Sequence, residues 1–424
     1  MNSVARAPWI DLIAALAVAT LTRTLLFLVS VSHPDRFLTK DSFEYDALAR
    51  HFSAAYVHAH GHLFDLSLVR PPGYPAFVDS VYTMAGRSIT HVIVVQLALS
   101  LATVALTYIF AARLAGRTVA TIAAFALAID PISIVMSSNL TTETLFAFVW
   151  VLAAVLWVRG LERGELSSTA SAGVLVGLSA LIRPIALYLP VLQLPLTALL
   201  LAGSRVRRSL AIVALALGFA VPVSLWLARN AERTGVATIS TIQSHNLLDY
   251  RAADALAIDT GVSRAEAVRR LEAEVARGVR PGQNPAQVSR VESSIAFHTL
   301  LHHPKGAVVS TLEGVGRVIF GPGRAELLRL VRGYTAPRGT FDRALEVAEA
   351  VVLFLSLALA AVGIVALVGQ RRWLPLAATL PFVAYDVLLS AGAEGNARLR
   401  MPAMPFVAIL AGIGAARALR RQIG

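Results

Sequence analysis

The chain has no cysteine among its 424 residues, so disulfides, thiolate metal sites and thiol nucleophiles are all excluded. Charged residues are scarce at 15%, whereas a soluble protein carries about a quarter. The alternation of polar and apolar residues that a membrane β-barrel needs is missing too. Instead, 56% of the residues are hydrophobic, and many lie in runs of about 20 that can cross a bilayer as helices. The sequence therefore predicts an all-α polytopic membrane protein.

Ten apolar segments have the length and composition of spanning helices, which predicts a bundle of about ten transmembrane helices. At Arg183-Pro184 the alternative is that the two short segments on either side form one re-entrant hairpin. The expected spans lie at about residues 9–31, 89–112, 118–137, 141–158, 169–183, 185–202, 209–228, 346–368, 374–391 and 402–418.

Arginines follow every second span, and the positive-inside rule assigns that side to the cytoplasm. We therefore expect a multi-pass protein of the plasma (inner) membrane with both termini in the cytoplasm. The net charge of +12 is then explained by helix ends that touch lipid head groups, and no nucleic-acid partner is expected. The arginines are Arg113, Arg117, Arg159, Arg163, Arg205, Arg207, Arg208, Arg371, Arg372, Arg417, Arg420 and Arg421.

This orientation leaves two long segments outside. We divide the chain into an N-terminal transmembrane module (1–228) with a first extracytoplasmic loop (32–88), an extracytoplasmic helical segment (229–345) and C-terminal transmembrane helices (346–424). Within the second segment, Ser263 with Glu266 predicts a helix start, and Pro285 predicts the first turn of a helix that reaches His302. Pro304 is expected to end that helix.

Two carboxylates are candidate catalytic groups on the extracytoplasmic side. Asp41 lies in the acidic stretch just beyond the first span, where it could take a proton from an acceptor hydroxyl or amine. Glu143 starts the fourth span, with Thr141 or Asn139 as its N-cap, and could face Asp41. The structural alternatives are a solvated loop face for the first acid and simple helix capping for the second.

Several arginines are expected at the same extracytoplasmic surface, although the positive-inside rule favours arginines on the cytoplasmic side. The geometry of a guanidinium group matches that of phosphate oxygens. Arg183 lies at membrane depth, where a charge is by default a candidate functional group. Anchoring at the membrane interface is the structural alternative. The candidate substrate-binding residues are Arg70 and Tyr74 in RPPGYP, Arg183, Arg229, His245, and Arg398 and Arg400 in RLRMP.

Four further polar residues are ambiguous from the sequence alone. Arg23 and Asp386 lie within expected spans and could pair with each other or serve the site. His302 and His303 could be read as metal ligands, but adjacent residues point in different directions, and a helix C-terminus explains them better. Nucleotide-binding glycine motifs, HExxH and Gly-x-Ser-x-Gly are not found.

Taken in order, these motifs resemble those of the GT-C glycosyltransferases, most closely the branch of protein O-mannosyltransferases and lipid A aminoarabinose transferases. The resemblance runs from the first span to the last. It rests on an arginine in the first helix, Asp41 with Tyr45, RPPGYPAF, DPISIVMSSNLTTETLF, GLSALIRPIALYLP, WLARN with STIQSHNL, HHPKG and RLRMPAMPFVAILAGIG.

The resemblance implies that a sugar moves from a polyprenyl-phosphate donor to a lipid, glycan or protein acceptor on the outer face of the membrane. Asp41 matches the catalytic acid of the first loop, and Glu143 matches a position that shapes the site or holds a metal in some members. These two carboxylates could thus hold a divalent cation such as Mg or Mn. Arg398 and Arg400 match an Arg-x-Arg element near the lipid phosphate.

We therefore expect an inverting displacement with Asp41 as general base and arginines that stabilise the departing phosphate. The alternative is a transporter or flippase for a lipid-linked or anionic solute, which predicts a polar path across the whole membrane. A third possibility is a non-catalytic subunit of an envelope assembly machine, which would not need Asp41.

Overall fold

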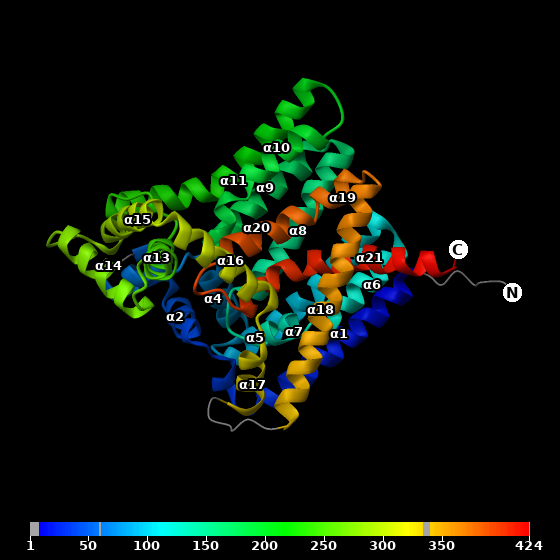
Figure 1. Ribbon diagram of the computed structural model, residues 1–424, viewed down its shortest axis with the longest axis horizontal. Coiled ribbons are helices and arrows are strands. Elements are labelled where there is room, and N and C mark those ends of the chain that lie inside the picture. The colour runs from blue at the N-terminus through cyan, green and yellow to red at the C-terminus, as the bar shows by residue number, and fades with distance from the viewer. Residues whose placement is uncertain (1–7, 59–60, 334–339, 424) are drawn as a thin grey trace.

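The computed structural model describes residues 8–58, 61–333 and 340–423, which form helices and no strand (Figure 1). Within these residues, seven helical stretches are long and apolar enough to cross a membrane. They are α1 (Pro8–Ser30), α5 (Ile89–Ala115), α8 (Glu143–Arg163), α11 (Arg205–Thr234), α18 (Thr340–Gly369), α19 with α20 (Trp373–Ala377 and Leu380–Ser390), and the 3-10 helix η5 with α21 (Ala397–Ala403 and Met404–Ile423).

The three remaining expected spans also coincide with helices, and the predicted all-α membrane fold is confirmed. An eighth span is broken: α6 (Arg117–Ala128) and α7 (Pro131–Ser137) meet at an angle of 57°. Two apolar helices are shorter, α9 (Leu166–Ile182) and α10 (Pro190–Leu200), and the 3-10 helix η3 (Pro184–Tyr188) separates them. The chain is an integral membrane protein.

The two segments expected outside the membrane, 32–88 and 229–345, are called the first outer loop and the second outer segment. The first outer loop is helical. It contains η1 (Pro34–Phe37), α2 (Lys40–Arg50), the π-helix η2 (Ser53–His58), α3 (Gly61–Val69) and α4 (Gly73–Ala85). The second outer segment contains α12 (Ile242–Asn246), η4 (Leu247–Ala252), α13 (Ala253–Thr260), α14 (Arg264–Gly278), α15 (Pro285–His302), α16 (Pro304–Phe320) and α17 (Arg324–Arg332).

Two predicted helix starts in the second segment are confirmed. The Ser263 hydroxyl accepts a hydrogen bond from the Glu266 backbone N–H at 3.2 Å, and Asn284 forms a capping box ahead of Pro285. Pro304 was expected only to end α15, but it also occupies the first position of α16. Proline is well suited to that position because the first helical N–H has no intrahelical partner.

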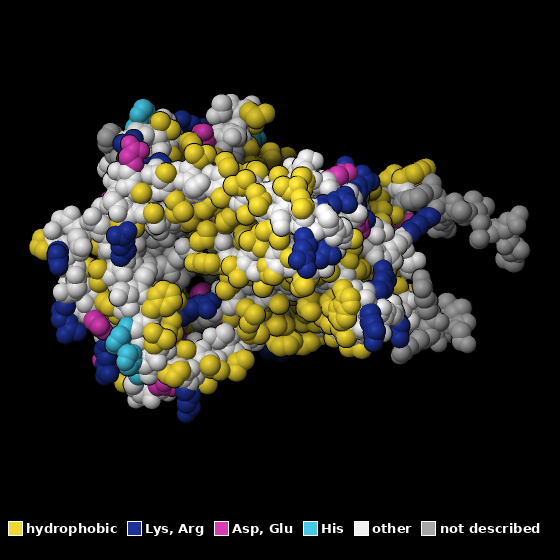
Figure 2. Space-filling view, turned by 90° about the horizontal axis from the view of Figure 1, so that it is seen from above, with side chains coloured by type: hydrophobic (Ala, Val, Ile, Leu, Met, Phe, Trp, Pro, Cys, Tyr) yellow, Lys and Arg dark blue, Asp and Glu magenta, His cyan; other side chains and the backbone are white. Residues whose placement is uncertain are grey.

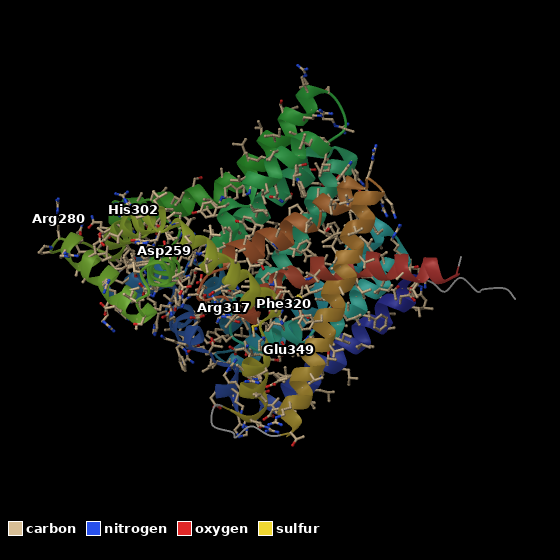
Figure 3. The ribbon with its side chains drawn as sticks, viewed as in Figure 1. Asp259, Arg280, His302, Arg317, Phe320 and Glu349 are labelled. Atoms are coloured by element: carbon tan, nitrogen blue, oxygen red, sulfur yellow. The ribbon has the colours of Figure 1, made fainter. Side chains whose placement is uncertain are left out.

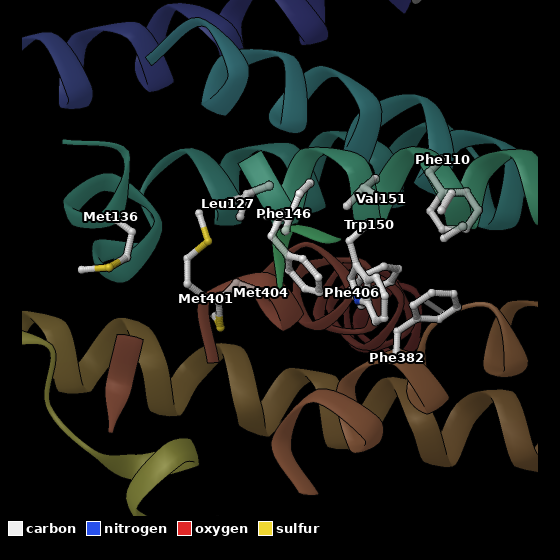
Figure 4. Close-up of a cluster of buried hydrophobic side chains, with 14 of the residues drawn as sticks. Phe110, Leu127, Met136, Phe146, Trp150, Val151, Phe382, Met401, Met404 and Phe406 are labelled. Atoms are coloured by element: carbon white, nitrogen blue, oxygen red, sulfur yellow. The ribbon is translucent and has the colours of Figure 1, made fainter. Parts of the chain in front are cut away.

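Small residues let the spanning helices approach closely. A Cβ added at Gly218 would collide with the Ala170 carbonyl, and one at Gly173 would collide with the Leu215 carbonyl, so α9 and α11 touch through their backbones. This is how helices associate in lipid, where apolar side chains gain little from leaving the solvent. Within the bundle, Phe146, Trp150, Phe382 and other buried hydrophobic side chains form a packed cluster (Figure 4).

Arg23 lies within α1 and binds a backbone carbonyl at the break between α6 and α7. The bend between α6 and α7 frees backbone carbonyls, and the Arg23 guanidinium donates to the Ala128 carbonyl at 2.9 Å and to the Ser100 hydroxyl at 2.8 Å. The considered pairing of Arg23 with Asp386 is not formed, since the guanidinium is bound elsewhere.

The two ends of the bundle differ. The start of α1 and the end of α21 lie together on one side, while α2, α13, α14 and α15 lie on the opposite side (Figure 1). A broad band of hydrophobic side chains crosses the surface between charged ends (Figure 2). The candidate site therefore lies at the end of the bundle formed by the two outer segments.

Candidate active site

Asp41 is fixed by the start of α2. The Ser42 hydroxyl accepts a hydrogen bond from the Thr39 backbone N–H and donates to the Leu140 carbonyl, both at 2.8 Å. The first turn of α2 is thereby tied to the chain just before α8. An acid in this turn is favoured by the helix dipole, and the Asp41 side chain is 27% exposed.

Arg70 is held in place by the turn that follows α3. Its backbone carbonyl accepts a hydrogen bond from the Tyr56 hydroxyl at 2.7 Å, and its guanidinium lies 5.1 Å from the centre of the Tyr45 ring. Gly73 is needed because a Cβ there would meet Leu181 and Ile182 at the end of α9. The RPPGYP motif thus packs onto the helix end that carries Arg183.

Glu143 and Arg183 meet where two helices end. Glu143 is the first residue of α8, whose N-cap is Thr142 rather than the predicted Thr141 or Asn139, and its side chain is fully buried. Arg183 takes an extended conformation after α9 and before Pro184, which directs its guanidinium to the Glu143 Oε1 atom at 2.7 Å. A buried carboxylate needs such a partner, since an unpaired charge is costly there.

Arg398 connects the two carboxylates. Its Nη2 atom lies 2.7 Å from Asp41 Oδ2, and its Nε atom lies 2.5 Å from Glu143 Oε1. Residues far apart in the sequence thus meet at one point, and the predicted facing of Asp41 and Glu143 is confirmed. We call the resulting chain of ion pairs the outer ion-pair network; it consists, in order, of Glu44, Arg70, Asp41, Arg398, Glu143 and Arg183.

Charges in this network alternate and sum to zero. Burial alone would raise the pKa of Asp41, but the neighbouring Arg398 and Arg70 guanidiniums outweigh it and hold the pKa below its usual value. Asp41 is therefore ionised at neutral pH. Glu44, which the prediction left out of the site, binds the Arg70 Nε atom at 2.6 Å.

Tyr74 supports the network without touching its charged groups. Its hydroxyl donates to Gln96 at 2.6 Å, and its ring packs against Tyr45 with the centroids 4.9 Å apart. Tyr45 in turn lies beneath Arg70. Tyr74 is fully buried, so its position fits a packing role better than the predicted contact with substrate.

Arg400 points away from Asp41, although it is only two residues from Arg398. Its guanidinium donates to the Val318 and Gly321 carbonyls at 3.3 and 2.5 Å, and it lies 3.4 Å from Glu349 on α18. Figure 3 shows Glu349 beside the end of α16 that carries Phe320, far from His302 and Asp259. Arg400 therefore joins helices rather than facing the predicted phosphate.

Arg229 and His245 also lie apart from the network. Arg229 donates to the Tyr56 carbonyl at 3.0 Å and stacks on Trp226, with 4.7 Å between the guanidinium and the ring centre. His245 is half-exposed and lies 3.3 Å from Asp249. The two were expected beside the other cations, but their contacts are with separate elements.

A cavity of about 570 Å³ opens beside Asp41 and Arg398. Three arginines of α17 and Lys40 contribute to its wall, and none of these four was predicted as a site residue. The signal available in the sequence was the spacing of Arg324, Arg329 and Arg332 within nine residues. We call this space the α17 cavity.

The carboxylates do not fit the divalent cation that the sequence suggested. The Arg398 guanidinium occupies the position between Asp41 and Glu143, and Arg70 holds the second Asp41 oxygen. Divalent cations need oxygen ligands around them, and a positive guanidinium at their centre opposes binding. Among the described residues, no three His, Asp or Glu side chains are placed to hold a metal ion.

Residues 69–226 match the family model described as dolichyl-phosphate-mannose-protein mannosyltransferase. The matched segment is a little over a third of the chain. It contains Arg70, Glu143 and Arg183 but not Asp41 or Arg398. No curated protein matches the chain.

Solved structures resemble the whole chain. The apo form of the oligosaccharyltransferase from Archaeoglobus fulgidus has a TM-score of 0.59 at 14% identity, with 99% of this chain and 52% of that chain covered. The same enzyme tethered to an acceptor peptide with an NVT sequon has a TM-score of 0.56 at 14% identity, covering 99% of this chain and 51% of that chain. This chain spans about half the length of the oligosaccharyltransferase.

A weaker likeness, with a TM-score of 0.43 at 16% identity, is to ArnT from Cupriavidus metallidurans bound to undecaprenyl phosphate, covering 98% of this chain and 79% of that chain. The family match over residues 69–226 agrees with the resemblance that the motifs predicted, and the chain shares its fold with the oligosaccharyltransferase.

Proposed function

We propose that this chain, which has the fold of the GT-C membrane glycosyltransferases, moves a sugar from a polyprenyl-phosphate donor to an acceptor on the extracytoplasmic side of the membrane. One observation carries the proposal: Arg70, Arg183 and Arg398 converge on Asp41 and Glu143 at one end of the bundle. A set of this kind combines cations for a phosphate with a carboxylate that can accept a proton.

The arginines stabilise the leaving group. When the bond between the anomeric carbon and the phosphate oxygen breaks, its electron pair stays with the polyprenyl phosphate, whose negative charge increases. Guanidiniums positioned beforehand lower the energy of that charge without having to reorganise. Arg398 and Arg70 are best suited because both lie against Asp41, where the reaction takes place in this proposal.

Asp41 serves as the general base. The acceptor oxygen or nitrogen attacks the anomeric carbon from the face opposite the phosphate, which inverts the configuration, and its proton passes to an Asp41 oxygen. Glu143 keeps Arg398 and Arg183 in position through a single buried oxygen, so it is a positioning residue. No step needs a metal ion, in keeping with the guanidinium that lies between the carboxylates.

The donor itself makes Asp41 a better base. Two guanidiniums hold the pKa of Asp41 low, which makes it a weak proton acceptor. A phosphate that draws Arg70 and Arg398 toward its own oxygens weakens their hold on the carboxylate, and the pKa of Asp41 rises. Base strength thus increases once the donor is bound.

The distribution of buried groups favours a transferase over a transporter. A transporter needs polar groups along a path through the whole membrane, whereas the interior beneath the network is filled by aromatic side chains. Trp150 and Phe382 are in contact there, with ring centroids 5.5 Å apart, and both are buried (Figure 4).

The test is transfer by the purified protein from a panel of polyprenyl-phosphate sugars, with and without EDTA. Asp41→Asn is expected to lower the release of polyprenyl phosphate by at least about a hundredfold, whereas EDTA leaves it unchanged. Asp35→Asn is the matched control, because Asp35 lies in the neighbouring helix η1 and is exposed. Full turnover by a folded Asp41→Asn protein would refute the role of this residue as base.

A further inference from the structure

The α17 cavity is suited to a polar ligand. Of the twelve described residues that line it, eight are charged, and only Ala325 and Leu328 have apolar side chains. Its volume of about 570 Å³ is in the range of small-molecule sites. A polyprenyl chain needs an extended apolar wall, which two apolar side chains among the described lining residues do not supply.

Positive charge prevails in its lining, where five cations face three carboxylates. Several cations have fixed partners: Arg332 lies 3.1 Å from Asp342, and Arg324 pairs with Glu346. Lys40 is different, because it is exposed and no described carboxylate lies within ion-pair distance. The cations are Lys40, Arg324, Arg329, Arg332 and Arg398, and the carboxylates are Asp41, Glu326 and Asp342.

Arg329 supports the cavity from behind. Its side chain is 4% exposed, and it donates to the Leu38 carbonyl at 2.9 Å and to the Asn139 side chain at 2.6 Å. These bonds attach α17 to the segments that precede α2 and α8. The α17 wall of the cavity is therefore fixed relative to Asp41 by bonds to the segments that also position the network.

Asp41 and Arg398 form the boundary between this cavity and the rest of the network. Asp41 and Arg398 belong to the cavity wall, whereas Arg70, Glu143 and Arg183 do not. If the donor phosphate binds to the arginines on the far side, the nucleophile reaches the Asp41 carboxylate from the α17 cavity.

We propose that the α17 cavity is the acceptor site and that the acceptor carries a phosphate or carboxylate close to the group that receives the sugar. A cavity with an excess of positive charge attracts such an acceptor and orients it, and the unpartnered Lys40 ammonium is its first contact. This inference rests on the proposed function, because it assigns one of the two substrates of that reaction.

The chain itself supplies a selective probe. It has only two lysines, Lys40 and Lys305. Lys305 is exposed near the start of α16, outside the cavity, and is an internal control. Purified protein is acetylated with an N-hydroxysuccinimide ester, and the two rates are compared by mass spectrometry in glucose 6-phosphate or in glucose, each with and without saturating undecaprenyl phosphate.

Glucose 6-phosphate is expected to slow acetylation of Lys40 by about threefold or more, while glucose has no effect and Lys305 is unchanged. The protection persists with undecaprenyl phosphate bound, because the two ligands occupy different sides of Asp41. Equal rates in both sugars would overturn the proposal, and so would protection by undecaprenyl phosphate alone, since the cavity would then belong to the donor.

Binding of glucose 6-phosphate to variants gives a second readout. Lys40→Glu is expected to weaken it by about tenfold, whereas Lys40→Arg and Lys305→Glu leave it unchanged. Loss of binding in Lys305→Glu as well would point to a general surface charge effect and contradict the site. Because both readouts measure binding, their failure in a protein that still transfers sugar refutes the acceptor site alone.

Discussion

Arg398 and Arg400 are two residues apart but have different contacts, which depend on their positions in one helix. Both lie in η5, a 3-10 helix, in which residues two apart point in different directions. Arg398 consequently faces Asp41 and Glu143, while Arg400 turns toward α16 and α18 and bonds backbone carbonyls there. One arginine belongs to the site, and the other joins helices.

This difference predicts that replacement by lysine impairs catalysis at position 398 and stability at position 400. Arg398→Lys removes the planar fork that reaches two carboxylates at once and is expected to lower kcat by about a hundredfold. Arg400→Lys is expected to leave kcat close to that of the wild type and to lower the melting temperature, because its buried carbonyl bonds are lost. Thermal melts and turnover of both variants check this, and equal losses of kcat would contradict the assignment.

The pH dependence follows from the lowered pKa of Asp41. A carboxylate with a depressed pKa is ionised above that value, so its contribution to stability and its capacity as a base are lost only as the pH falls through it. The acidic limb of kcat/KM should therefore lie below about pH 4.

Arg70→Gln removes one of the two guanidiniums that lower the pKa of Asp41. The acidic limb of kcat/KM should consequently move to higher pH. Arg229→Gln is the control and should leave the limb in place, since Arg229 contacts other elements. A limb that does not move in Arg70→Gln would show that another group controls the profile.

At this scale, the sequence could identify the residue types but not all of their contacts. Arg70, Arg183 and Arg398 were predicted as site residues because cations on the side that the positive-inside rule disfavours, or at membrane depth, suggest a ligand. Asp41 and Glu143 were predicted because a carboxylate there could accept a proton and because both match the family motifs. Arg229, His245 and Arg400 met the same criterion, and only their packing distinguishes them. Lys40 could not be identified, because its role depends on α17, which is remote in the sequence.

Interrupted helices place the site residues. Arg183 follows the end of α9, Glu143 begins α8 and Arg398 lies in the 3-10 turn ahead of α21. A charged side chain in the middle of a continuous helix would point into lipid or into a packed interface. Helix ends instead bring these groups together at one end of the bundle.

Close helix contacts predict where the bundle is least tolerant of added volume. Gly218→Leu places a side chain against the Ala170 carbonyl and is expected to cost about 1–3 kcal/mol or more. Gly316→Leu on α16 is the control, because an added Cβ there meets nothing within 4 Å. Thermal melts in detergent measure the stability of both variants. Equal melting temperatures would contradict the predicted close contact between α9 and α11.

Span positions could be predicted from sequence because length and hydropathy are local properties. The bend between α6 and α7 and the brevity of α10 could not, since they depend on how neighbours satisfy the freed backbone groups. The contact of Arg23 with the Ala128 carbonyl is one such dependence. Helix starts at Ser263 and Pro285 were predictable because capping is also local.

At the scale of the whole molecule, the orientation in the membrane is open to a direct test. The natural chain has no cysteine, so a single introduced cysteine is the only thiol. Ala265 on α14 and Ala202 between α10 and α11 are both exposed, and they lie at opposite ends of the proposed topology.

A membrane-impermeant maleimide is expected to label Ala265→Cys on intact cells and to label Ala202→Cys only after the membrane is opened. The reason is that arginines gather at the helix ends around residue 202, which assigns that side to the cytoplasm. Labelling of residue 202 alone on intact cells would show the reverse orientation, with the site on the cytoplasmic side. Labelling of both positions on intact cells would contradict the proposed topology.

The central claim is that the arginines of the outer ion-pair network hold the phosphate of a polyprenyl carrier. Native mass spectrometry can measure this by comparing the binding of undecaprenyl phosphate with that of undecaprenol, which has the same chain without the charge. The wild type and Arg229→Ala should prefer the phosphate, and Arg398→Ala should reduce that preference by about tenfold or more. An unchanged preference in Arg398→Ala, or equal binding of both lipids by the wild type, would contradict the account.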